Sequence, residues 1–484
     1  MIYSVIPAKG QRSASRNLPV ALHGQTLAGT VLRMHAQTDA RPHWQIWAIA
    51  GPAILANSSA PLVGLVDTWA IGHLSSPVYL AAVGLGSIIF NYLLWAFGFL
   101  RMGTTGLIAQ ARGRDDQAGL VATALRSCGL ALAFALGLLL MQEWLLVLSL
   151  RVMAPPQDVA QVTADYFHIR IWAAPATLLN YAITGVLFGL ARVKSILWLQ
   201  LLLNVSNGLL NVFFVIGLHM GVPGVAWGTL IAQYATAIAS IWVLLRLLDH
   251  DVLLQNLRNA STWRIAQFGQ LISVNGFIFL RTILLMTALA LIMRHAGGMG
   301  DVAMAASHVA MQFLLLMSLG LDGFAHAAEA LAGAAWGQAQ RMAFRRWVFL
   351  TGLWALVASL VYATLFWLGG NALTALLTDL PSVRAVVSTL MPLMVLLPLV
   401  SVWCFQFDGV FIGATAGAAM MGTMAIAFAV YLLVLNPMTE AWGITGLWGA
   451  VLVFMAVRGL AQAAWYPFLE KRLARIQGSL APVP

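Results

Sequence analysis

The stretch AVVSTLMPLMVLLPLVSVWCF, residues 385–405, contains 21 residues and no charged side chain. A helix rises 1.5 Å per residue, so a stretch of this length crosses a hydrocarbon core of ~30 Å. Apolar runs of this kind recur along the 484-residue chain, which is 61% hydrophobic and only 9% charged. Soluble domains carry about 25% charged residues. The composition therefore excludes a soluble domain and predicts an all-α membrane protein.

The apolar runs predict twelve transmembrane helices. With the N-terminus inside, 18 of the 26 Lys and Arg fall in cytoplasmic segments and three in outer loops. Such an excess predicts that both termini are cytoplasmic, and the scattered basic residues argue against nucleic-acid binding despite the net charge of +10. The expected spans are 45–71, 79–107, 119–149, 164–190, 196–218, 223–247, 265–293, 302–335, 346–377, 385–412, 416–436 and 441–468.

The chain repeats itself at an offset of 224 residues, close to half its length. Ala111, Gly113, Gly185 and Gly189 recur as Ala335, Gly337, Gly409 and Gly413. Six spans per repeat predict two parallel six-helix lobes related by a pseudo-two-fold axis along the membrane normal. The expected organisation is a basic, disordered cytoplasmic tail (1–43, with Met34 as an alternative start), an N-lobe (44–248), a cytoplasmic linker (249–264), a C-lobe (265–470) and a cytoplasmic tail (471–484).

Asp67 is the one carboxylate in the first span, and Pro52 and Pro61 can each bend that helix. A carboxylate inside a bilayer costs ~2.5–3.5 kcal/mol on insertion scales, so it needs a partner or a function. Two interpretations stay open for Asp67: a protonation switch, or a structural hydrogen bond to a neighbouring helix.

The C-lobe holds a second set of intramembrane charges. Asp322, His326 and Glu329 are spaced four and three residues apart, so they form one stripe of a helix. Either the stripe forms a buried network with Arg281 on the adjacent span, or it binds substrate or protons. Asp408, which precedes a Gly-rich run, allows the same alternatives.

Amide side chains mark the fourth and fifth spans of the N-lobe. Asn207 and Asn211 lie four residues apart on one face, and Asn180 and Asn204 add two further amides. Such groups hold helices together or line a polar cavity. The sequence has no phosphate-binding Gly-Lys-Ser/Thr loop and no metal-ligand spacing, so we expect no cofactor and no metal site. The energy source would be a proton gradient, with sodium as the alternative.

Three motifs resemble the multidrug and toxic compound extrusion (MATE) family, in its DinF-like branch. They are GLVDTWAIGHLSSPVYL (64–80), FGFLRMGTTGLIAQA (97–111) and LDGFAHAAE (321–329). The resemblance covers about residues 44–470. It implies an antiporter of the bacterial inner membrane that exports amphipathic, often cationic, organic compounds in exchange for protons or sodium.

The resemblance also implies roles for individual residues. Asp67 is the expected protonation site, and its protonation bends the first helix near Pro52. The expected partners are Tyr166, Asn180, Asn207 and Thr229. Some relatives have an acid where this chain has Asn211, or a Glu on the seventh span, which here has no acid between Leu271 and Arg294; both departures favour protons through Asp67.

The sequence thus indicates a secondary transporter rather than an enzyme, acting on small organic substrates and protons in the lipid bilayer, with no obligate protein partner evident. Two alternatives remain. A lipid-linked precursor flippase would need several cavity-facing cations, of which Arg281 is the clearest. A membrane-embedded enzyme or scaffold would need a catalytic pair, for which Asp322 and Glu329 are the candidates.

Overall fold

The computed structural model of the protein describes residues 41–72 and 77–480, while the side chains of residues 60–72 and 480 lie outside the described part. The expected tail at 1–43 therefore lies outside it up to residue 40, as does Met34. All described secondary structure is helical. The helices are α2 (Pro42–Gly72), α3 (Pro77–Trp95), α4 (Phe99–Gly113), α5 (Gln117–Leu140), α6 (Gln142–Met153), α7 (Gln157–Arg170), α8 (Ala174–Gly189), α9 (Val193–Val212), α10 (Gly221–Leu247), α11 (His250–Arg258), α12 (Gly269–Gly298), α13 (Asp301–Gly337), α14 (Arg341–Leu377), α15 (Pro381–Gly413) and α16 (Gly417–Leu480).

Several neighbouring helices form one span together. Short 3₁₀ turns at Ala96–Gly98 and Ile171–Ala173 join α3 to α4 and α7 to α8, and a π turn at Phe213–Gly217 extends α9. Conversely, the backbone of α16 leaves the helical conformation at Gly443 (φ 56°, ψ −134°), which divides this helix into the eleventh and twelfth expected spans. The described helices thus cover all twelve expected segments.

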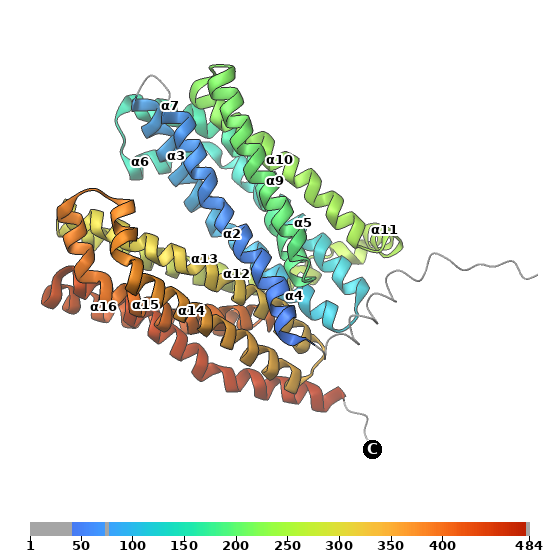
Figure 1. Ribbon diagram of the computed structural model, residues 1–484. Helices are drawn as coiled ribbons and strands as arrows, with labels where there is room; N and C mark the ends of the chain where they lie inside the picture. Colours follow the sequence, from blue (N-terminus) through green and yellow to red (C-terminus); the bar gives the residue numbers. More distant parts are fainter. Residues whose placement is uncertain (1–40, 73–76, 481–484) are drawn as a thin grey trace, which may run out of the picture. The chain divides into compact units, whose positions relative to one another are not determined.

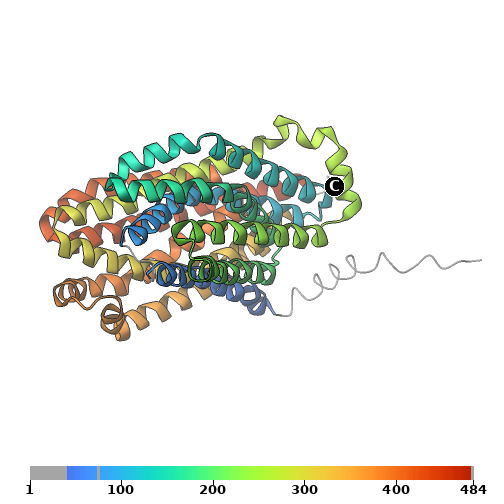
Figure 2. The same cartoon turned by 90° about the horizontal axis from the view of Figure 1, so that it is seen from above.

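Ten of the described helical segments are long and apolar enough to cross a membrane, with α16 counted as one. The protein is therefore a multi-pass membrane protein. Figure 1 shows α13 to α16 grouped together in yellow to red, and Figure 2 shows from above that they lie lengthwise beside one another. We call α2–α10 the N-lobe and α12–α16 the C-lobe. The pair α11 and the 3₁₀ turn Ala260–Trp263 occupies the expected linker.

The repeat is confirmed by equivalent glycine contacts in the two lobes. A Cβ on Gly185 of α8 would lie 2.5 Å from the carbonyl oxygen of Arg101 on α4. A Cβ on Gly409 of α15 would lie 2.2 Å from the carbonyl oxygen of Ala325 on α13. Both contacting pairs differ by the same offset of 224 residues. Glycine at these positions lets two helix backbones approach closely, as is common between membrane helices.

The helix ends repeat as well. The residues after α4, α8, α13 and α15 all have positive φ, namely Asp115 (53°), Ala191 (56°), Ala339 (55°) and Thr415 (51°). In each case the backbone N–H of the following residue donates a hydrogen bond to the carbonyl oxygen five residues earlier, as Asp116 N does to Ala111 O at 3.0 Å. This is the Schellman way of satisfying the last carbonyls of a helix. Its occurrence at equivalent positions confirms two copies of one fold.

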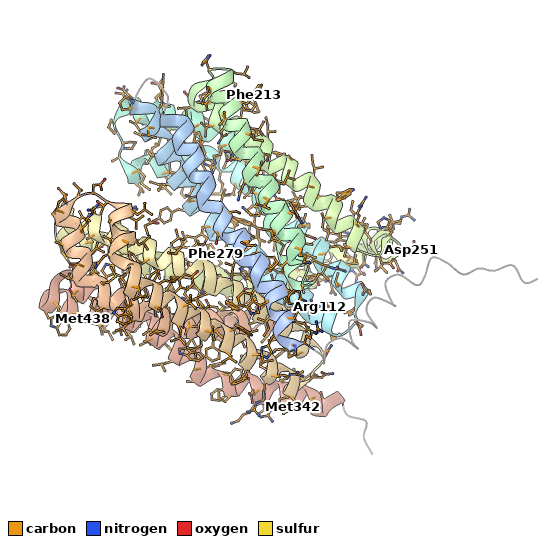
Figure 3. All side chains as sticks on the ribbon, in the orientation of Figure 1. Arg112, Phe213, Asp251, Phe279, Met342 and Met438 are labelled. Carbon is orange, nitrogen blue, oxygen red and sulfur yellow. The ribbon has the colours of Figure 1, made fainter. Side chains whose placement is uncertain are left out.

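The lobes meet where α4 packs against α13 and α15. A Cβ on Gly113 would lie 2.1 Å from the carbonyl oxygen of Ala334, and a Cβ on Gly337 would lie 2.2 Å from that of Gln110. These two contacts are equivalent under the repeat, so they confirm a pseudo-two-fold relation between the lobes. Arg112, labelled in Figure 3, adds a hydrogen bond across this junction from its Nη2 to the carbonyl oxygen of Ala330 at 2.8 Å.

The C-terminal helix is longer than the sequence indicates. Residues 471–484 are expected to form a tail, whereas α16 continues to Leu480. Leu469 and Leu473 are buried in a cluster with Trp336 and Phe344. Glu470 accepts hydrogen bonds or ion pairs from Arg341 and Arg345 at 3.1 Å each. Tertiary packing therefore maintains the helix beyond its apolar span.

Candidate functional site

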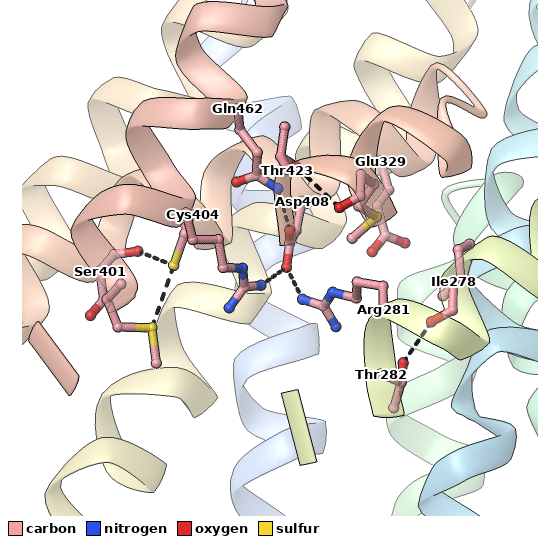
Figure 4. A network of polar contacts seen from close by, with 12 residues as sticks. Ile278, Arg281, Thr282, Glu329, Ser401, Cys404, Asp408, Thr423 and Gln462 are labelled. Atoms are coloured by element: carbon pink, nitrogen blue, oxygen red, sulfur yellow. Dashed lines mark hydrogen bonds and ion pairs between the residues drawn. The ribbon is translucent and has the colours of Figure 1, made fainter. Parts of the chain in front are cut away.

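Asp408 of α15 is the centre of a buried charge cluster in the C-lobe (Figure 4). Its Oδ2 accepts hydrogen bonds from Arg281 of α12 and Arg458 of α16, and its Oδ1 accepts one from Gln462 Nε2 at 2.7 Å. All four side chains are buried. One carboxylate thus neutralises part of the charge of two guanidinium groups. A charge inside a membrane protein is far less costly when it is paired in this way.

Among the described residues, Arg281 forms no hydrogen bond or ion pair with the stripe on α13, although it lies within electrostatic range of Asp322. Arg281 pairs with Asp408, whereas Glu329 Oε2 accepts from Arg101 Nη1 of α4 at 3.3 Å. His326 Nδ1 lies 3.2 Å from Glu329 Oε1. The Arg101–Glu329 pair joins the two lobes, because α4 and α13 belong to different repeats.

Asp322 belongs to the same stripe but is only half buried. The described residues provide no hydrogen bond or ion pair for its carboxylate, although it lies within electrostatic range of Arg101, His326 and Arg281. Its charge is therefore the least compensated of the three acids described inside the C-lobe.

The N-lobe amides converge on one face of α10. Asn207 Nδ2 of α9 donates to Thr229 Oγ1 at 3.0 Å, and Asn180 Nδ2 of α8 donates to the backbone and side-chain oxygens of Gln233, each at 3.3 Å. Thr229 and Gln233 are four residues apart and so occupy one stripe of α10. This stripe connects three of the residues predicted to cooperate.

Two further predicted N-lobe residues, Tyr166 and Asn211, have different contacts. The hydroxyl of Tyr166 accepts a hydrogen bond from Arg170, and its ring packs edge-on against Phe90 with centroids 6.3 Å apart. Asn211 is buried against Gly228, whose Cβ would lie 2.0 Å from Asn211 Oδ1. The described contacts of Tyr166 include neither Asn207 nor Asn180, whereas Asn211 lies beside the residue that precedes Thr229 on α10.

The first helix is connected to the amide-rich face at Ser59. Asn204 Nδ2 of α9 donates to Ser59 Oγ of α2 at 2.7 Å, and Gln200 Nε2 donates to Asn204 Oδ1 at 3.0 Å. Asp67 and Pro61 are part of α2, but their side chains lie outside the described part. Pro52 lies within α2 and is half buried. The role of Asp67 and the bend in this helix stay predictions.

Sequence reasoning missed several partners. Arg101, Arg458 and Gln462 complete the charge clusters, and Ser59 and Gln233 complete the amide contacts. Position inside an apolar span was the signal available for both arginines, because an unpaired cation there is costly. Their partners lie 228 and 50 residues away along the chain, so no local spacing could identify them.

Two repeated lobes of membrane helices, close-packed about a pseudo-two-fold axis and carrying paired charges inside, define a two-lobe helical membrane protein. The MatE family model matches residues 52–216 and 278–438. The protein belongs to the MatE family.

Relatives by sequence span bacteria and plants. The chain is 36% identical to DNA damage-inducible protein F of Escherichia coli over 429 residues, which cover 87% of this chain and 91% of that protein. It is 26% identical to "Probable multidrug resistance protein NorM" of Pseudomonas aeruginosa over 87% of each chain. It is also 26% identical to the chloroplastic protein DETOXIFICATION 44 of Arabidopsis thaliana, over 87% of this chain and 81% of that one.

Solved structures share the fold. A structure described as the outward-facing conformation of a multidrug resistance MATE family transporter matches 89% of this chain and 96% of its own, with a TM-score of 0.78 and 20% identity. A MATE structure in the bent conformation matches 91% of this chain and 98% of its own, again with a TM-score of 0.78 and with 18% identity. At these identities the likeness establishes the fold. The solved structures thus confirm the expected all-α two-lobe architecture, and the family model and the 36% identical relative confirm the family resemblance.

Proposed function

We propose that the protein is a proton-coupled antiporter that exports amphipathic or cationic organic compounds across the bacterial inner membrane by alternating access, with both termini cytoplasmic. The observation that carries this proposal is the reciprocal junction of Gly113 with Ala334 and Gly337 with Gln110. Glycine-mediated contacts around a pseudo-two-fold axis can form and separate as two rigid lobes rock. The junction lies beside the turns that the charge pattern assigns to the cytoplasm.

The substrate class is supported by the names of relatives. NorM of Pseudomonas aeruginosa is described as a "Probable multidrug resistance protein", and the outward-facing structure is described as that of a multidrug resistance transporter. We extend this to small organic compounds for the present chain. Charged groups of both signs lie inside the lobes, among them Arg101, Arg281, Arg458, Asp322, Glu329 and Asp408.

The coupling step is assigned to Asp67. A proton from outside neutralises its carboxylate, α2 bends near Pro52, and the substrate leaves; deprotonation toward the cytoplasm resets the site. Support comes from the hydrogen bond between Asn204 of α9 and Ser59 of α2. Ser59 lies eight residues before Asp67 on the same helix. A change in the bend of α2 would thereby reach the amide contacts of α9 and α10.

The test uses proteoliposomes that contain wild-type protein or Asp67→Asn, with a pH-sensitive dye inside and ethidium as the substrate. We expect ethidium-triggered proton movement in the wild type, independent of a sodium gradient, and its loss in the variant at equal reconstitution. Asp251→Asn, in the exposed helix α11, is the matched control and should transport normally. Unchanged transport by Asp67→Asn would refute the proposed site. Proton-silent, sodium-dependent flux would assign the coupling ion as sodium.

A lipid-linked precursor flippase is the second candidate, because Arg101 and Arg458 add two internal cations to Arg281. The pairing of these three arginines with Asp408 and Glu329 lowers the positive charge available to a pyrophosphate and favours the antiporter. Transfer of a fluorescent lipid-linked pyrophosphate across the same liposomes, without ethidium flux, would reverse this choice.

A further inference from the structure

Arg101 and Glu329 form an ion pair between the lobes, deep within the span. The guanidinium Nη1 of Arg101 lies 3.3 Å from Glu329 Oε2, and the two side chains are 17% and 2% exposed. Arg101 is twelve residues before the end of α4, and Glu329 is eight before the end of α13. At 1.5 Å per residue these positions are about 12–18 Å from the helix ends, near the middle of a ~30 Å core.

Each ion has a second partner in its own lobe. His326 Nδ1, one turn before Glu329 on α13, lies 3.2 Å from Glu329 Oε1. Arg101 lies over the ring of Phe188 on α8 of the N-lobe, with its guanidinium carbon 5.3 Å from the ring centroid. His326 also contacts the N-lobe, with its Nδ1 3.5 Å from Arg101 Nη1 and its ring centroid 4.3 Å from that of Phe188. Separation of the lobes would break these contacts and the bond between Arg101 and Glu329, but it would leave each ion with one contact in its own lobe. This matters because a buried charge without any partner is very costly.

The ion pair is the charged part of a wider interface. Between it and the helix ends, Gln110 Nε2 donates to the carbonyl oxygen of Gly413 at 2.9 Å and to Thr415 Oγ1 at 3.1 Å. These bonds have neutral partners that water can replace once the lobes part. The Arg101–Glu329 pair is different, because its strength depends on the exclusion of water.

We propose that Arg101 and Glu329 form an inter-lobe latch that stabilises the state described here, and that Phe188 and His326 hold the two ions when the lobes separate. The inference rests on the alternating access of the proposed function and adds to it which residues set the balance between the two states. Breaking the latch shifts the lobes toward separation. Loss of Phe188 or His326 has a smaller effect, because it removes a contact of the separated state as well as contacts between the lobes.

The test measures a distance between spin labels. Asp115→Cys and Met342→Cys place labels at exposed positions beside the inter-lobe junction, in a background with Cys128→Ala and Cys404→Ala. Double electron–electron resonance in lipid nanodiscs then measures the distance between the two labels. This distance is short when the lobes are in contact and long when they have separated. Glu329→Gln should raise the ratio of long to short distances by about 10-fold, within the range usual for coupling energies. The charge exchange Arg101→Glu with Glu329→Arg should restore the short distance.

Two further variants separate a latch from a merely structural cluster. His326→Ala and Phe188→Leu each remove contacts between the lobes as well as one contact within a lobe. They should therefore raise the ratio of long to short distances less than Glu329→Gln does. A merely structural cluster would respond equally to all three variants, and that result would overturn the proposal. Glu143→Gln is the matched control, because it breaks the ion pair of Glu143 with His168 inside the N-lobe alone, and it should leave the distances unchanged.

This experiment does not depend on the coupling ion. It uses neither substrate nor an ion gradient, so a failed Asp67→Asn assay would leave its result unaffected. Conversely, distances that stay unchanged in Glu329→Gln would refute the latch while proton-coupled transport through Asp67 could stand.

Discussion

Ala109 and Gly333 occupy equivalent positions of the two repeats and contact each other. A Cβ on Gly333 would lie 2.9 Å from the Cβ of Ala109, and the two residues are separated by the repeat offset of 224. Equivalent residues of two related units meet only where the symmetry axis passes. The pseudo-two-fold axis therefore runs between α4 and α13, and residues beside it control how closely the lobes approach.

Gly337→Ala should prevent full closure of the junction. Its new Cβ would lie 2.2 Å from the carbonyl oxygen of Gln110, a backbone atom that cannot move aside. Overpacking of this kind costs about 1–3 kcal/mol. It would destabilise only the closed state, in which the two backbones are in contact. We expect transport in proteoliposomes to fall about 10-fold for each 1.4 kcal/mol. Gly137→Ala, with no neighbour within 4 Å, is the control; equal transport by both variants would contradict this role of the junction.

Asp408→Asn should destabilise the C-lobe more than loss of either arginine. The substitution leaves Arg281 and Arg458 buried without a counter-charge, a situation that typically costs 3–5 kcal/mol. Arg458→Met keeps one guanidinium opposite one carboxylate, so its effect should be small. Thermal unfolding in detergent, followed by tryptophan fluorescence, gives the melting temperatures of the variants and so the order of their stabilities. A lower melting temperature for Arg458→Met than for Asp408→Asn would show that the arginine, and not charge balance, stabilises the cluster.

Thr229→Val should impair transport more than stability. The change removes the acceptor for Asn207 on α10, and such hydrogen bonds between membrane helices contribute ~0.6 kcal/mol on average. If the α10 stripe orients the N-lobe site, ethidium transport should fall about 10-fold, within the range usual for coupling between sites. Thr287→Val, at an exposed position of α12 whose hydroxyl bonds only to its own helix, is the control. A parallel, small loss in both variants would assign Thr229 a packing role.

Leu473→Ala should destabilise the protein although it lies beyond the last expected span. Leu473 is fully buried against the ends of α13 and α14, and removal of a buried leucine side chain costs about 2–5 kcal/mol. Leu460→Ala, at a position 69% exposed, should have little effect. Melting temperatures in detergent compare the two; an unchanged value for Leu473→Ala would mean that the C-terminal turns of α16 do not contribute to the fold.

The amino-acid sequence by itself determined the helices, the two lobes and the family. Each span is a local property, because twenty consecutive apolar residues need a helix to satisfy their backbone in lipid. The repeat needed only the offset of 224, which places Gly185 and Gly409 at equivalent helix contacts. The boundaries were less well determined at α16, since Leu473 stays helical through contacts with residues far away along the chain.

Only the tertiary structure decided which charges are partners. The span that carries Arg281 is followed directly by the span that carries Asp322, His326 and Glu329. Nevertheless, Arg281 forms its ion pair with Asp408, and Glu329 forms one with Arg101 of the other lobe. Pairing depends on how each helix is rotated about its axis and on how the lobes dock, which are properties of long-range packing. Sequence spacing specifies which side chains share a face of a helix, and the packing of the lobes specifies what that face meets.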